Sequence, residues 1–145
     1  MIHRRRSAVV LGFALFGLAH AALAKTEIKG AAILEHPCGK VSVKHMGLVH
    51  DGKMDEAVKL GTPEMQKAWK ALPAGDREMM SGMMKEMSRT AAAFSAEIKN
   101  SGLLVVDGKD ATLTVTKASK DANGSSTETM TQRFVIDGAS CLISK

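Results

Sequence analysis

The sequence predicts a single α+β domain in which N-terminal helices pack on one face of a curved antiparallel sheet. Helix-capping residues dominate the chain up to about residue 89, and alternating apolar segments separated by glycine turns dominate after it. Of the 145 residues, 121 remain after a 24-residue leader is subtracted, a length that suits one domain. Helices followed by an antiparallel meander are typical of α+β folds.

Residues 1–24 have the three parts of a secretory signal peptide. A basic start with arginines at positions 4–6 precedes an apolar run over 8–18, and Ala22 and Ala24 satisfy the small-residue rule for cleavage. The apolar run is shorter than the ~20 residues that span a bilayer. We therefore expect cleavage after Ala24, no stable membrane insertion afterwards, and a mature domain of residues 25–145 in the periplasm.

The charge of the mature chain is low. The full sequence has a net charge of +5, and three arginines leave with the leader, so the mature chain has a net charge of +2. Its basic residues are scattered, and aromatic residues that stack on bases make up only 3% of the sequence. This pattern argues against nucleic-acid binding.

Helix-capping signals predict a series of helices in the first part of the mature domain. Pro37 suits a first helical turn, Asp51-Gly52 ends a helix, and Thr62 before Pro63 forms an N-cap with proline at the first helical position. Asp76 is a further predicted N-cap. The expected elements are a short strand over Ile28–Leu34 and helices over 40–50, 54–60, 63–72 and 76–89.

Strand patterns and turn signals fill the second part. Residues 111–116 alternate with the period of a half-buried strand, Asn123-Gly124 is a hairpin signal, and Asp107-Gly108 and Asp137-Gly138 are turns. The expected extended segments are 94–98, 103–106, 111–116, 126–136 and 141–144.

Cys38 and Cys141 are the two cysteines of the chain. In an oxidising compartment an even pair usually forms a disulfide, whereas a cysteine metal site requires more Cys or His at ligand spacing. We expect a Cys38–Cys141 disulfide that joins the start of the fold to its last strand.

Residues 46–58, of sequence MGLVHDGKMDEAV, and the strands over 111–116 and 128–136 resemble a known superfamily. They are similar to small exported bacterial proteins of the lumazine-binding-like, domain-of-unknown-function branch of the nuclear-transport-factor-two-like (cystatin-like cone) superfamily. The resemblance implies a cone-shaped sheet wrapped on a long helix, with an apolar pocket. It implies no particular substrate. Cys141 departs from the pattern, because the closing strand of such proteins commonly has a tryptophan. Cone folds often dimerise through the open sheet face, and Thr112, Thr114 and Thr116 are compatible with a homodimer.

The segment 79–87 is unusually rich in methionine. At 100° per residue its five methionines fall within about 140° of one helical face, which predicts a buried stripe. Thioether side chains are flexible and polarisable, so they suit a pliable core or a groove that fits irregular partners. The predicted ligand-binding residues are Met79, Met80, Met83, Met84 and Met87, and the predicted ligand is a small apolar molecule or a protein segment.

Soft-metal binding is the alternative interpretation of the same segment. Thioethers select Cu(I) and Ag(I), and the candidate ligands are Met80, Met83, Met84 and Met87, with His45, Met46 and His50 as further donors. Methionines at helical spacing are more often packing residues, so we expect no metal and no other cofactor.

The sequence argues against an enzyme. It contains no tyrosine, its aspartates 107, 110, 121 and 137 all lie in turn signals, and no nucleophile elbow is present. The sequence thus favours an exported, non-enzymatic binding or interaction module. The alternatives are a periplasmic Cu(I)/Ag(I)-binding protein and a neutraliser of a periplasm-targeted toxin.

Overall fold

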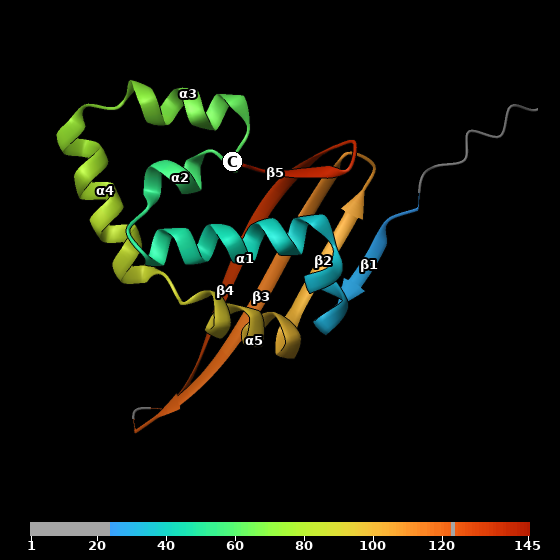
Figure 1. The fold of residues 1–145 in the computed structure, drawn as a ribbon. Helices are drawn as coiled ribbons and strands as arrows, with labels where there is room; N and C mark the ends of the chain where they lie inside the picture. Colours follow the sequence, from blue (N-terminus) through green and yellow to red (C-terminus); the bar gives the residue numbers. More distant parts are fainter. Residues whose placement is uncertain (1–23, 123) are drawn as a thin grey trace, which may run out of the picture.

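The computed structural model describes residues 24–122 and 124–145, which form one α+β domain (Figure 1). Most of the predicted leader lies outside the described residues. In chain order the elements are β1 (Thr26–Lys29), the 3-10 helix η1 (Gly30–Glu35), α1 (Pro37–His50), α2 (Met54–Val58), α3 (Pro63–Ala71), α4 (Ala74–Met87), α5 (Ala91–Ser101), β2 (Gly102–Asp107), β3 (Asp110–Asp121), β4 (Gly124–Asp137) and β5 (Ser140–Ser144).

The five strands form one open antiparallel sheet in the order β1-β2-β3-β4-β5. Helices α1 and α5 lie across the same face of this sheet (Figure 1). The α+β class, the single domain and the antiparallel meander predicted from the sequence are confirmed.

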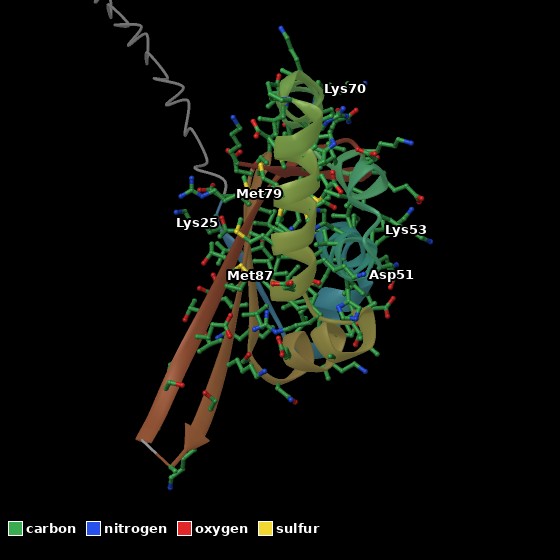
Figure 2. The ribbon with its side chains drawn as sticks, turned by 90° about the vertical axis from the view of Figure 1, so that its left-hand side faces the viewer. Lys25, Asp51, Lys53, Lys70, Met79 and Met87 are labelled. Atoms are coloured by element: carbon green, nitrogen blue, oxygen red, sulfur yellow. A yellow bond between two sulfur atoms is a disulfide. The ribbon has the colours of Figure 1, made fainter. Side chains whose placement is uncertain are left out.

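Strands β3 and β4 are much longer than their neighbours. They pair from Asp110↔Val135 to Asp121↔Gly124, whereas β2 lies opposite only residues 110–115 of β3 and β5 opposite only residues 133–137 of β4. The far part of the β3–β4 hairpin therefore projects as a two-stranded arm, away from the helices (Figures 1 and 2).

The core consists of two clusters. The main cluster lies between the sheet and the helices and includes Phe94, Ile98, Leu113 and Phe134. The second joins α1, α2 and α3 around Trp69, and Met80 and Met84 of α4 pack against it; its buried members are Val49, Met54, Ala57, Val58 and Trp69. The second cluster thus fixes α4 beside the end of α1.

The predicted Cys38–Cys141 disulfide is present, across a sequence separation of 103 residues. It joins the first turn of α1 to β5, and both cysteines belong to the main buried cluster. The disulfide therefore ties the helical layer to the edge strand of the sheet.

Several predicted helix ends are confirmed. Pro37 lies in the first turn of α1, Gly52 adopts a φ of 75° just after that helix, and the Thr62 hydroxyl accepts a hydrogen bond from Met65 N–H at the start of α3. These signals act over a few residues, so local chemistry predicts them well.

Three predicted elements differ from the structure. Residues 94–98 are not extended but belong to α5, because Phe94 and Ile98, four residues apart, share the buried face of a helix that Thr90 caps. The leading strand ends at Lys29, where Gly30, at φ 61°, begins a 3-10 helix. Asp76 is not an N-cap. It lies in the first turn of α4, where its negative charge interacts favourably with the positive end of the helix dipole.

Candidate functional site

The methionines of α4 divide into two rows. Met79, Met83 and Met87 are 68%, 54% and 74% exposed, and Met79 and Met87 lie on the side of α4 turned away from Lys53 (Figure 2). Met80 and Met84 are half-buried against the second cluster. The predicted buried stripe is therefore wrong for three of the five residues. Only Met80 and Met84 pack against the second cluster, so the other row of the helix stays exposed.

A groove of about 280 Å³ lies between α1, the C-terminal end of α4 and β4. Three separate elements supply thioether side chains to its wall: Met46 from α1, Met84 and Met87 from α4, and Met130 from β4. The remaining lining residues are His45, Val49, Ser88, Arg89, Glu128, Thr131 and Gln132. The lining is mainly apolar and has a polar rim.

Of the predicted ligand-binding residues, Met84 and Met87 line this groove, whereas Met79, Met80 and Met83 do not. Sequence reasoning missed Met130, although a signal for it exists. Met130 lies opposite the buried Val115 in the β3–β4 register, and it shares the strand parity of the buried Phe134. Both relations place its side chain on the helix-facing side of the sheet.

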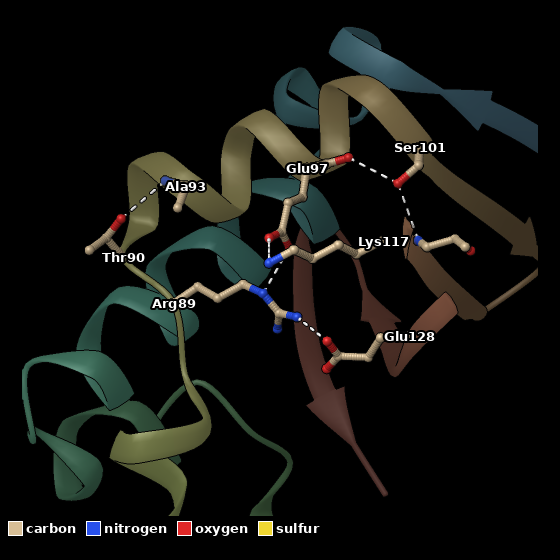
Figure 3. Close-up of polar contacts among 8 residues, drawn as sticks. Arg89, Thr90, Ala93, Glu97, Ser101, Lys117 and Glu128 are labelled. Carbon is tan, nitrogen blue, oxygen red and sulfur yellow. Dashed lines mark hydrogen bonds and ion pairs between the residues drawn. The ribbon is translucent and has the colours of Figure 1, made fainter. Parts of the chain in front are cut away.

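A chain of ion pairs holds the rim (Figure 3). The Arg89 guanidinium lies 3.0 Å from Glu97 Oε2 of α5 and 2.9 Å from Glu128 Oε2 of β4, and Lys117 Nζ lies 3.7 Å from Glu97 Oε1. Arg89 and Glu97 are largely buried, whereas Glu128 and Lys117 are at least half exposed. The network fixes the connection between α4 and α5 against the hairpin and pairs the Glu128 carboxylate with a cation beside the groove.

Two polar contacts flank the apolar wall. Ser42 Oγ of α1 donates a hydrogen bond to Gln132 Oε1 of β4, and His50 Nδ1 lies 3.4 Å from Ser88 Oγ. His45 also lines the groove, and burial lowers the pKa of its imidazole below 6.5. At neutral pH its ring is therefore uncharged.

A larger cleft of about 440 Å³ lies on the other side of α4, beside Trp69. Its wall mixes carboxylates, among them Asp55 and Glu78, with the cations Lys53 and Arg77. Trp69 Nε1 donates a 2.7 Å hydrogen bond to Asp55 Oδ1. This mixture of charges favours no single class of ligand, in contrast to the mainly apolar lining of the methionine groove.

Among residues 24–122 and 124–145, no three His, Cys, Asp or Glu side chains form a group that could hold a metal ion. In the same part of the chain, every helix is too short or too polar to cross a bilayer.

No protein-family model, no curated protein and no solved structure matches this chain. The chemistry of the groove is therefore the basis for assigning a function.

Proposed function

We propose that this chain is an exported, non-enzymatic binding module that holds an apolar side chain of a partner protein segment in the groove between α1, α4 and β4. The observation that carries the proposal is the convergence of four methionines from three elements, Met46, Met84, Met87 and Met130, on one wall. Sequence spacing alone accounts for only two of them, so their convergence is a property of the fold.

Methionine suits such a wall for a physical reason. Its unbranched thioether side chain has three rotatable bonds and a polarisable sulfur, so it adapts to ligands of irregular shape. The groove, at about 280 Å³, lies just below the ~300–1,000 Å³ of pockets for drug-sized ligands. Its size therefore fits one or two apolar side chains, or a short alkyl chain, better than a large metabolite.

The exposed row of α4 extends the apolar surface beyond the groove. Met87 belongs to both, and Met83 and Met79 continue the row at intervals of four residues, one turn of helix apart. Clustered exposed apolar side chains mark binding surfaces more often than isolated ones do. A partner segment that fills the groove would cover this row as well.

Two further points support export of the protein and an apolar pocket between its sheet and its helices. The Cys38–Cys141 disulfide is compatible with export, since such bonds persist in oxidising compartments. The similarity to the cystatin-like cone superfamily implies an apolar pocket between sheet and helix, and the groove lies between β4 and the helices α1 and α4. We propose the cone as the finer description of the open antiparallel sheet.

Binding of the neutral fluorescent probe N-phenyl-1-naphthylamine tests this function. We expect its fluorescence to rise with the mature wild-type protein and to fall at least several-fold with Met87→Gln, because a polar amide then replaces a thioether in the groove wall. Met79→Gln is a matched control: Met79 lies on the same helix, has a similar exposure of 68% against 74%, and does not line the groove.

Equal probe binding by the Met87→Gln and Met79→Gln proteins would contradict the assignment of the groove. Circular dichroism of both variants verifies that the fold is kept. Because Met87 is exposed and does not belong to the core, its replacement leaves the packed clusters intact.

A soft-metal site is a second candidate, favoured by the donors that the fold adds. Met46, Met84, Met87 and Met130 line the groove together with the uncharged imidazole of His45, and thioether and imidazole ligands suit Cu(I). Of the ligands predicted for this alternative, Met80 and Met83 lie outside the groove.

Titration of the tag-free protein with Cu(I) against a chromogenic chelator tests the second candidate. Stoichiometric uptake that is lost when Met84, Met87 and Met130 are changed to Leu would support it, since leucine keeps the apolar volume and removes the donor. Uptake that is weak in the wild-type protein would exclude it.

A further inference from the structure

Strand β4 has a free edge beside the groove. Strand β5 pairs only with residues 133–137 of β4, and within the described residues no strand lies beside 124–132 on that side. The opposite side of β4 pairs with β3 without interruption along the whole arm. The backbone of nine residues is thus paired on one side only.

The ladder shows which backbone groups point outward. Ile136 N–H donates at 2.7 Å to the carbonyl of Lys109, one residue beyond the Asp110↔Val135 pair, so the even residues of β4 direct their N–H and C=O groups toward β3. The odd residues direct theirs to the other side, where Arg133, Val135 and Asp137 meet β5. Along the free edge the outward residues are Ser125, Thr127, Thr129 and Thr131.

Apart from Glu128, whose helix-facing carboxylate is paired with Arg89, this edge carries none of the features that usually protect strands from pairing. Natural edge strands are protected by proline, by lysine, by bulges or by inward-pointing charges. Residues 124–132 contain neither proline nor lysine, and the β3–β4 register shows no bulge. The one charged side chain, Glu128, is engaged by Arg89.

We propose that this edge pairs with the same edge of a second copy of the chain, around a two-fold axis, to form a continuous sheet through two β4 strands. An isolated two-stranded hairpin is marginally stable in water, and pairing of two arms converts each into part of a four-stranded sheet. The Ser- and Thr-rich edge favours a second copy over an apolar foreign strand, which would contact an apolar side chain only at Met130. Opposed threonines stabilise cross-strand pairs.

The charge of Glu128 disfavours one of the possible registers. A two-fold axis perpendicular to the sheet keeps the helix-facing sides of both copies together, so residues of the same parity oppose each other. An axis at Thr127 places Ser125 opposite Thr129 of the second copy, and every outward N–H and C=O of 125, 127 and 129 gains a partner. It also places Glu128 opposite Ser126 of the second copy. An axis at Glu128 would instead oppose two carboxylates, which is unfavourable.

The test is the molar mass of the mature, disulfide-bonded protein by light scattering at increasing concentration. We expect twice the monomer mass for the wild type, and the monomer mass for Thr127→Pro/Thr129→Pro. Proline at these positions removes outward N–H groups and leaves the β3 ladder intact. Thr127→Val/Thr129→Val keeps the N–H groups and should remain dimeric.

A wild-type protein that stays monomeric at all concentrations would overturn the proposal. So would a dimer that persists in the proline variant, which would place the interface elsewhere, for instance on the sheet face of Thr112, Thr114 and Thr116. This inference is independent of the groove ligand.

A second measurement covers the case in which the proline variant fails to fold. Mild oxidation of Thr127→Cys should give a covalent dimer, because an axis at Thr127 brings the two cysteines opposite each other. Ser119→Cys, on β3 of the same arm, should stay monomeric. Equal cross-linking of both variants would contradict the β4 edge as the interface.

Discussion

Ser42 Oγ donates a hydrogen bond to Gln132 Oε1 and so joins α1 directly to β4 beside the methionine groove. Ser42 is only 1% exposed, so water cannot replace its hydroxyl. The contact fixes the spacing of the two elements that carry Met46 and Met130. This one hydrogen bond therefore contributes both to the stability of the fold and to the shape of the groove.

Ser42→Ala should lower the free energy of unfolding by about 1–3 kcal/mol, because it leaves the Gln132 amide oxygen without its buried donor. Urea denaturation measures the change. Ser140→Ala, at the exposed start of β5, is the control and should change stability by less than about 0.5 kcal/mol. Equal stability of the Ser42→Ala and wild-type proteins would show that the hydrogen bond contributes nothing.

Removal of the disulfide should have the largest single effect on stability. Closure of a loop of about 100 residues restricts the unfolded chain and stabilises the fold by about 4–5 kcal/mol in the chain-entropy model. We expect a loss of this order for Cys38→Ala/Cys141→Ala in urea denaturation. A loss below about 1 kcal/mol would mean that the unfolded chain is already compact.

Gly39 permits a close approach of two backbone segments. A Cβ atom at this position would lie 1.9 Å from the carbonyl oxygen of Ile33, the buried residue of η1. Because the obstacle is backbone, Gly39→Ala should displace η1 from α1 and lower the melting temperature strongly. Gly82→Ala, where the added Cβ would meet no atom within 4 Å apart from the backbone of its own helix and its chain neighbours, should leave the melting temperature unchanged or raise it. A Gly39→Ala protein with the same melting temperature as the wild type would contradict the close packing of α1 against η1.

Stability should fall as the pH drops below 6.5. Burial lowers the pKa of His45, and also that of His36, in the folded state. Between the lowered pKa and 6.5 the unfolded chain binds more protons than the folded chain. The contribution of these histidines to the free energy of unfolding is therefore fully present above pH 6.5, and it is lost as the pH falls from 6.5 through the folded-state pKa. Protonated His36 also cannot accept its hydrogen bond from Cys38 N–H through Nδ1.

Chemical denaturation at a series of pH values measures this dependence. The slope should flatten in His45→Gln and in His36→Asn, whose side-chain oxygen retains an N-cap acceptor at any pH. Unchanged slopes in both variants would assign the dependence to other groups.

Local signals predicted much of the fold. Thr62 before Pro63, Gly52 after α1 and the Asp-Gly turns lie where capping and turn chemistry require, because each depends on a few neighbouring residues. The Cys38–Cys141 pairing followed from the presence of just two cysteines. Helix α5 was missed because its two apolar anchors, Phe94 and Ile98, were interpreted as a strand and not as successive turns of one helix face.

The candidate site could be predicted only in part. Periodicity placed Met84 and Met87 on one helix, but which row faces the protein depends on how α4 packs against the cluster around Trp69. Met130 joins the groove through the register of β3 and β4, a contact between segments far apart in the sequence. The spacing of residues along the sequence does not show how these separate elements pack together.

The most direct test of the groove is a spectrum of methionine methyl groups labelled with carbon-13, recorded during titration with N-phenyl-1-naphthylamine. The proposed function predicts the largest shifts at Met46, Met84, Met87 and Met130, with smaller shifts at Met79 and Met83. Shifts confined to Met79 and Met83, or no shifts at any methionine, would contradict it.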